Sequence, residues 1–141
     1  MPGNTMTILI VEDDDVDFWA IERALTDLKI SNPVKRAHDG VEAFEILCGE
    51  TENNDALQTS VILLDLNMPR IGGLDFLQRL RKDPQLNHIP VIVSTTSSRN
   101  EDIITAFKYD VCGYVVKTDL HEGLREAFED MDMHKAFVIA A

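Results

Sequence analysis

Chemically reactive side chains stand at the ends of four apolar runs in this 141-residue chain. The first run leads directly into Glu12 and Asp13, and a later run ends in Asp65. Two further runs close with Thr95 and with Lys117. Carboxylates can ligate a hard cation or attack phosphorus, while a hydroxyl and an ammonium group can stabilise phosphate oxygens. These residue types suit divalent metal binding combined with phosphoryl transfer.

The apolar runs have the length and composition of buried strands. They cover residues 7–11, 34–38, 61–65, 91–95 and 113–117. Several are almost continuously apolar, which is typical of parallel strands that are covered on both faces. Stretches of helical period alternate with the runs, and the acids Asp39 and Asp119 each precede a glutamate by three residues, as helix caps do. The alternation predicts a doubly wound α/β fold with a five-stranded parallel sheet and five helices.

Such a fold gathers the reactive side chains at one place, because its ligands bind beyond the carboxyl ends of the strands. Acids that follow a strand can also simply cap the next helix. Several carboxylates at one edge would however repel each other unless a hard cation neutralised them, so we expect Mg²⁺, or Mn²⁺ in its place. The cation would screen an incoming phosphoryl group and allow Asp65 to become an aspartyl phosphate. Lys117 would pair with Asp65 at rest and with a phosphoryl oxygen afterwards, while Thr95 donates to another oxygen.

Four segments resemble the receiver domains of two-component response regulators. They are residues 8–14 (ILIVEDD), 63–69 (LLDLNMP), 91–97 (VIVSTTS) and 113–117 (GYVVK). The intervals agree with the family as well, because 30 residues separate Asp65 from Thr95 and 22 separate Thr95 from Lys117. The resemblance implies a flavodoxin-like receiver fold with strand order 2-1-3-4-5. It also implies a single domain over residues 1–141, with a core over about 7–132 and a short apolar tail over 133–141.

The resemblance assigns roles to the acids residue by residue. Asp65 is expected to be the phosphoacceptor, and Asp13 and Asp65 are expected to ligate the metal directly. Glu12 is expected to act mainly through a metal-bound water, and the backbone carbonyl of Asn67 to complete the protein ligands.

The resemblance also assigns a switch. Thr95 resembles the switch hydroxyl, Lys117 the phosphate-binding lysine, and Tyr114 the aromatic residue that swings inward as the hydroxyl moves; a plain strand residue with a half-exposed ring is the alternative for Tyr114. The family's lysine is usually followed by proline, often through a cis bond, whereas Thr118 follows it here. We expect either a trans bond with Lys117 slightly re-aimed or a strained cis bond.

A receiver of this kind implies phosphorelay signal transduction, with a sensor histidine kinase or a phosphotransfer protein as donor. Residues 95–98 and 100–103 resemble a subgroup that includes partners of bacterial phytochrome kinases, so a phytochrome is one candidate. The residues after 132 are too few for an output domain, which leaves a downstream protein target, or a homodimer through the helix 4–strand 5–helix 5 face and the apolar tail. The chain is not expected to be an enzyme beyond promoting its own phosphorylation and dephosphorylation.

The first predicted helix, about residues 15–29, carries an inward apolar stripe. The stripe consists of Phe18, Ile21, Leu25 and Leu28. Trp19 lies roughly 100° away from it and is expected at the rim, partly buried. We hypothesise that Trp19 belongs to the surface that docks the phosphodonor.

Composition excludes several classes of function. The formal net charge of −12 argues against nucleic-acid binding, which needs clustered Lys and Arg. The chain has no apolar run long enough to cross a bilayer and no secretion signal, so a cytoplasmic protein is expected. The cysteines Cys48 and Cys112 fall in no metal-type spacing and are expected to be buried, reduced thiols. The polar stretch 50–59 is expected to be a surface loop.

Two rival functions use the same residues. A receiver that serves only as a docking module would never be phosphorylated, although the presence of Asp13, Asp65 and Lys117 argues against it. A phosphatase of the haloacid-dehalogenase type also uses an aspartate nucleophile and Mg²⁺, but it needs a second acid two residues on. Asn67 stands there and cannot shuttle a proton.

Overall fold

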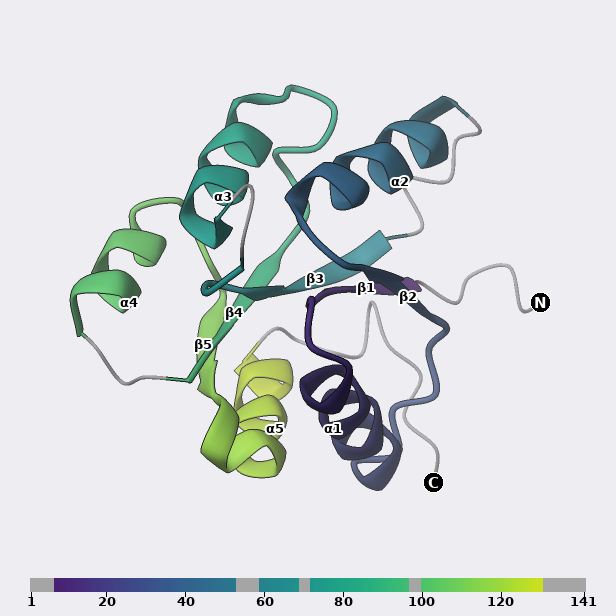
Figure 1. The fold of residues 1–141 in the computed structure, drawn as a ribbon, viewed down its shortest axis with the longest axis vertical. Coiled ribbons are helices and arrows are strands. Elements are labelled where there is room, and N and C mark those ends of the chain that lie inside the picture. Colours follow the sequence, from purple (N-terminus) through teal and green to yellow (C-terminus); the bar gives the residue numbers. More distant parts are fainter. Residues whose placement is uncertain (1–6, 53–58, 69–71, 97–99, 131–141) are drawn as a thin grey trace.

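One parallel sheet organises the chain, which a computed structural model describes over residues 7–52, 59–68, 72–96 and 100–130 (Figure 1). The strands are β1 (Thr7–Val11), β2 (Val34–Ala37), β3 (Thr59–Asp65), β4 (Val91–Thr95) and β5 (Gly113–Val116). Their order is β2-β1-β3-β4-β5, and every neighbouring pair is parallel. This arrangement confirms the predicted fold class and strand order.

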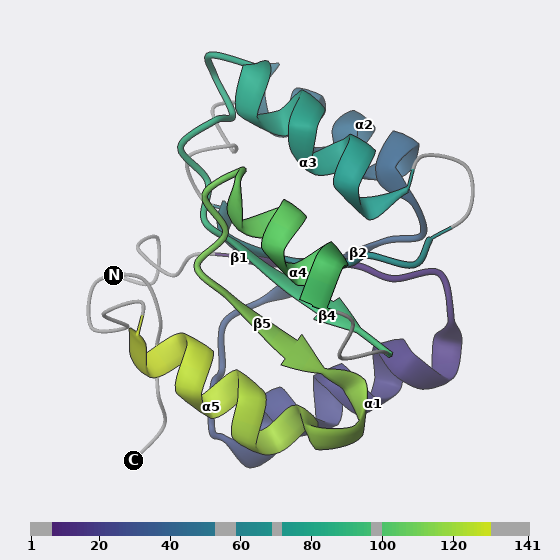
Figure 2. The same ribbon diagram turned by 90° about the vertical axis from the view of Figure 1, so that its left-hand side faces the viewer.

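Helices cover both faces of the sheet. The bounds are α1 (Asp15–Asp27), α2 (Gly40–Glu52), α3 (Gly73–Lys82), α4 (Asn100–Phe107) and α5 (Leu120–Asp130). Helices α1 and α5 lie on one face, and α2, α3 and α4 lie on the other (Figures 1 and 2). The sheet is therefore the middle layer of three, as the alternating strands and helices predicted.

Two apolar cores form because successive strand residues point to opposite faces. On β1, Ile8 and Ile10 pack with Phe128 of α5, whereas Leu9 and Val11 belong to the core on the other face. All four β1 residues are fully buried, and each such burial stabilises the fold by about 1.5–3 kcal/mol. Burial on both sides explains why the strand sequences are continuously apolar rather than alternating.

Acidic caps begin two of the helices. The Asp14 side chain accepts the backbone N–H of Asp17 at 2.8 Å and caps α1. The predicted cap before α2 is confirmed, because Asp39 Oδ1 accepts the N–H of Glu42 at 2.8 Å. Asp119 directly precedes α5 and ends a short 3-10 turn (Lys117–Asp119), and its role as a cap stays a prediction.

Two element boundaries differ from the expectations, whereas the peptide bond after Lys117 follows one of the two expected alternatives. Strand β5 ends at Val116 rather than at Lys117, which begins the 3-10 turn. The peptide bond after Lys117 is trans. Of the expected loop over 50–59, the first three residues complete α2 and Thr59 begins β3, while residues 53–58 lie outside the described part.

The two cysteines lie at the surface, which differs from the expectation. Both cysteines are free thiols, but they are exposed rather than buried. Cys48 follows the fully buried Leu47 on α2, and one step along a helix turns a side chain by about 100° away from the core. Cys112 lies just before β5, outside the sheet. The inward stripe of α1 is confirmed, with Leu28 only partly buried.

No helix in the described ranges is long and apolar enough to cross a membrane. The cytoplasmic location stays a prediction. The apolar tail over 133–141 lies outside the described residues.

Candidate functional site

The register of the sheet brings the reactive side chains to one edge. The last pairs along the strands are Val11 with Leu64, Asp65 with Ser94, and Thr95 with Val116. Glu12 therefore follows β1 beside Asp65 at the end of β3, and Lys117 follows β5 on the same edge. Sequence positions more than a hundred residues apart meet here because parallel strands all end on one side.

Three carboxylates converge at this edge. Glu12, Asp13 and Asp65 can each place one oxygen so that the three oxygens lie within 4.8 Å of one another. Glu12 and Asp65 are buried, at 1% and 2% exposure, whereas Asp13 is exposed. An all-oxygen donor set that is closed on one side and open to solvent on the other suits a hard divalent cation that keeps several waters. The residues therefore fit the expected metal.

Burial dominates the electrostatics of Glu12. It raises the pKa of this carboxyl to about 7, because the charged form is desolvated. The nearby ammonium of Lys117 opposes the shift, and repulsion from Asp65 adds to it. In the absence of a cation, the carboxyl group of Glu12 is thus partly protonated near neutral pH.

Lys117 is the cation that faces these acids. Its Nζ lies 2.8 Å from Glu12 Oε1, 2.8 Å from Asp17 Oδ2 and 3.4 Å from Asp65 Oδ1. Burial alone would lower the pKa of Lys117, but the close contacts with these carboxylates and their negative charges raise it above its ordinary value. The ammonium is therefore charged throughout the physiological range. The trans bond after Lys117 leaves it close to Asp65.

Backbone groups and hydroxyls frame Asp65. Its Oδ1 accepts the backbone N–H of Asn67 at 3.0 Å, and Asn67 Nδ2 donates to Thr96 Oγ1 at 3.2 Å. Thr95 is buried at the end of β4, with 2% exposure. The carbonyl of Asn67 as a metal ligand and the switch role of Thr95 stay predictions.

Gly73, at the start of α3, lets the helix pack against the strand end that carries Asp65. A Cβ atom there would lie 2.6 Å from the Cα of Leu66 and 2.7 Å from the carbonyl oxygen of Asp65. Both are backbone atoms, which cannot rotate away as a side chain would. Only a residue without a side chain fits this contact.

Tyr114 does not join the acid cluster. Its ring is 46% exposed on β5 and packs edge-on against Phe107 of α4, with ring centroids 6.4 Å apart. In this structure Tyr114 is therefore an ordinary strand residue with a half-exposed ring, which was the alternative to the switch role. An inward swing stays a prediction.

Two charged residues at the site were not predicted from the sequence. Asp17 binds Lys117, and Arg36 of β2 holds the loop after β1 by pairing with Asp15 at 2.8 Å and donating to the carbonyl of Glu12 at 3.1 Å. The pairing of β1 with β2 could have suggested that Arg36 lies near the site, because Arg36 pairs in register with Ile10, close to the end of β1. For Asp17 the only local signal was its place in the capped first turn of α1.

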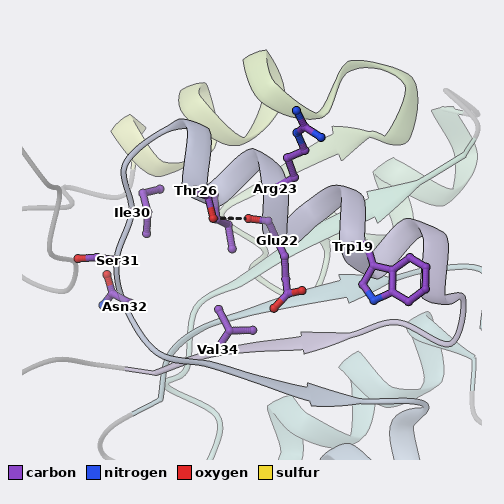
Figure 3. Close-up of a pocket in the computed structure, with 9 residues that line it drawn as sticks. Trp19, Glu22, Arg23, Thr26, Ile30, Ser31, Asn32 and Val34 are labelled. Carbon is purple, nitrogen blue, oxygen red and sulfur yellow. Dashed lines mark hydrogen bonds between the residues drawn. The ribbon is translucent and has the colours of Figure 1, made fainter.

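A separate groove of about 530 Å³ runs along the outer side of α1 (Figure 3). It is lined by residues of α1 and of the segment leading into β2, including Trp19, Glu22, Ile30 and Val34. Trp19 is 60% exposed and lines the groove, so it lies at the rim and is only partly buried, as expected. The groove is not part of the acid cluster.

A family model described as the response regulator receiver domain matches residues 8–129. The chain belongs to the response regulator receiver family. Among curated receivers, the response regulator Rcp1 of Synechocystis is 32% identical over 79% of this chain and 76% of its own length. The chemotaxis protein CheY1 of Helicobacter pylori is 33% identical over 88% of this chain and 94% of its own length.

Solved receiver structures superimpose closely. The bacteriophytochrome response regulator AtBRR gives a TM-score of 0.79 at 32% identity, covering 91% of this chain and 93% of its own. The phosphorylated cyanobacterial phytochrome response regulator RcpA gives 0.78 at 30% identity, covering 94% and 98%. The Mn²⁺-bound form of Rcp1 gives 0.74 at 28% identity, covering 96% and 99%.

Membership fixes the general function. The chain is a phosphorelay signalling receiver, and its partner in a two-component system is a histidine kinase. Receivers bind a divalent metal, and the cluster of Glu12, Asp13 and Asp65 is compatible with one.

Proposed function

We propose that Asp65 accepts a phosphoryl group from a sensor histidine kinase, or from a phosphotransfer protein, in a Mg²⁺-dependent reaction. The observation that carries the proposal is the meeting of a buried Asp65 with Glu12, Asp13 and the ammonium of Lys117 at one edge of the sheet. Asp65 is 2% exposed, whereas Asp13 of the same cluster is exposed to solvent, the side from which a donor can approach.

The transfer forms one bond and breaks one. A carboxylate oxygen of Asp65 attacks the phosphorus of a phosphohistidine, the new O–P bond forms, and the P–N bond breaks with its electron pair left on the imidazole nitrogen. Lys117 then pairs with a phosphoryl oxygen, and the hydroxyl of Thr95 donates to another. Asn67, which already donates its N–H to Asp65, keeps the carboxylate oriented.

Glu12, Asp13, Asp65 and the carbonyl of Asn67 would hold the metal. A bound divalent cation supplies charge neutralisation for the carboxylates and for the phosphoryl oxygens. Mg²⁺ suits an all-oxygen donor set, and Mn²⁺ accepts the same ligands. The Mn²⁺-bound state of the relative Rcp1 supports a divalent cation at this site.

The exposed part of α1 beside the site is the proposed docking surface for the kinase. Val16 and Trp19 are 67% and 60% exposed, although both are large and apolar. Tryptophan is enriched among the residues that dominate binding energy in interfaces. The phytochrome response regulators among the similar structures support a bacterial phytochrome as the donor.

A second exposed apolar group on α4 and β5 is the proposed output surface. It consists of Ile104, Phe107 and Tyr114, which are each 45–61% exposed. Inward movement of Thr95 and Lys117 on phosphorylation would vacate space for Tyr114 and reshape this surface. We propose that a downstream protein or a second copy of the chain binds there, with the tail over 133–141 contributing to the homodimer.

One receiver domain is proposed for the whole chain, with its core over about 7–132. The match of the family model to residues 8–129 supports this extent.

Phosphorylation can be tested by intact mass. Incubation with acetyl phosphate and Mg²⁺ should add about 80 Da to the wild type. Neither Asp65→Asn nor wild-type protein treated with EDTA should gain mass. Wild-type protein that stays unmodified would refute the proposal and leave the docking module, whereas continuous release of phosphate from small phosphate esters would favour the phosphatase.

A further inference from the structure

Lys117 makes its hydrogen bond away from the proposed phosphoacceptor. The Nζ donates to Asp17 Oδ2 at 2.8 Å, while its contact with Asp65 Oδ1 is 3.4 Å long and is an ion pair only. Glu12 Oε1 lies 2.8 Å from the ammonium but accepts no hydrogen bond from the described residues. Of the three carboxylates around Lys117, Asp17 is thus the one toward which an N–H is directed.

Asp17 is well placed to hold the ammonium. It lies in the first turn of α1, where its own backbone N–H is fixed by the cap Asp14. A carboxylate in the first turn also interacts favourably with the helix dipole. The Lys117 side chain is only 9% exposed, so it has few other positions to occupy.

We propose that Asp17 is a positioning residue that keeps Lys117 in a resting position and must release it when a phosphoryl group arrives on Asp65. The inference rests on the proposed function, in which Lys117 binds a phosphoryl oxygen. The ammonium has three N–H donors, so the conflict concerns the position of Nζ. Nζ lies 2.8 Å from Asp17 Oδ2 and 3.4 Å from Asp65 Oδ1, and it must move away from Asp17 to contact a phosphoryl oxygen on Asp65. Asp17 therefore competes with the phosphoryl group for Lys117, and it favours the unphosphorylated state.

The competition can be measured with beryllium fluoride, which mimics an acyl phosphate without a transfer step. Wild-type protein is titrated with it at saturating Mg²⁺ by calorimetry, and compared with Asp17→Asn. The variant should bind about five- to tenfold more tightly, which is the effect of losing one charged hydrogen bond to a partly exposed partner. Unchanged or weaker binding would overturn the inference. A wild type that binds no beryllium fluoride would instead contradict the proposed function.

A charge effect must be separated from competition for Lys117. Asp15→Asn removes the same charge from the same helical turn, at a side chain that is 63% exposed and pairs with Arg36 instead. It should tighten binding less than twofold. An equal gain in both variants would reduce the role of Asp17 to general repulsion and overturn the inference.

A double-mutant cycle tests whether Asp17 acts through the lysine. In a Lys117→Met background, Asp17→Asn should change the affinity less than twofold. Persistence of the full five- to tenfold effect would show that Lys117 is not the intermediary.

The position of the ammonium can also be followed directly, by NMR of ¹⁵N-labelled lysine Nζ groups. Asp17→Asn should shift the Lys117 signal in the resting protein but not in the beryllium fluoride complex. An equal shift in both states would mean that Lys117 never leaves Asp17. Thermal unfolding monitored by circular dichroism checks that each variant is folded.

Discussion

Raising the pH from 6 to 8 should tighten Mg²⁺ binding about tenfold, because Glu12 must lose its proton before it can face a cation. Burial raises the pKa of this carboxyl to about 7 in the metal-free protein. Its ionised fraction then increases from about one-tenth at pH 6 to about nine-tenths at pH 8, and the apparent affinity follows that fraction. Asp13, the exposed member of the cluster, does not share this burial.

Isothermal titration calorimetry measures both the affinity and the proton. Titrations at pH 7 in two buffers of different ionisation enthalpy should show about half a proton released for each Mg²⁺ bound. Glu12→Gln is the matched variant, because it keeps the shape of the side chain and removes the ionisation. Its affinity should be weaker at pH 8 and should vary little from pH 6 to 8.

A wild-type affinity that does not change with pH, or the same pH dependence in Glu12→Gln, would exclude Glu12 as the ionising group. Both proteins carry the same four histidines, so imidazole ionisation cancels in the comparison.

The raised pKa of Glu12 also affects the stability of the metal-free protein. Because the folded state keeps the Glu12 proton up to about pH 7 and the unfolded state releases it near 4.5, Glu12 makes the metal-free protein less stable as the pH rises through this window.

Three further substitutions test separate parts of the structure. Gly73→Ala should lower the free energy of unfolding by about 1–3 kcal/mol and slow labelling by acetyl phosphate, because its Cβ would meet the backbone of Leu66; a urea midpoint equal to wild type would contradict this. Arg81→Met should destabilise the protein by about 2–4 kcal/mol in urea unfolding, since the guanidinium donates to four backbone carbonyls, and a loss below 1 kcal/mol would count against the role of this contact. Trp19→Ala should slow phosphotransfer from a purified histidine kinase about tenfold or more while leaving labelling by acetyl phosphate unchanged, with Val41→Ala as the exposed apolar control; equal rates in both variants would exclude Trp19 from docking.

The architecture and the acid cluster were readable from the sequence because they depend on local signals. Continuous apolar runs mark strands that are buried on both faces, and parallel strands necessarily end at one edge of the sheet. Residues that directly follow those runs must therefore meet. Glu12, Asp65 and Lys117 could be placed together without knowing any side-chain conformation.

The features that the sequence missed depend on side-chain directions and long-range contacts. Asp17 and Lys117 are 100 positions apart, and their contact depends on how the first turn of α1 sits over the end of β5. The exposure of Cys112 depends on how closely neighbouring segments approach, which periodicity does not determine. Strand β5 ended one residue early because Lys117 turns into a 3-10 segment, and no residue type at that point signals the turn.

The charges at the site favour an order in which the metal binds before the phosphoryl group. If every group is ionised, the carboxylates of Glu12, Asp13, Asp17 and Asp65 and the ammonium of Lys117 leave three formal negative charges. A dianionic phosphoryl group would approach this excess unfavourably. In the metal-free state, burial raises the pKa of Glu12, and repulsion from Asp65 adds to the shift. A divalent cation reduces the excess to one charge, and it acts on the carboxylates that Lys117 does not hydrogen bond. The lysine can then leave Asp17 for the phosphoryl oxygen without exposing Asp65 to uncompensated repulsion, so the cation and the lysine have different roles and neither can replace the other.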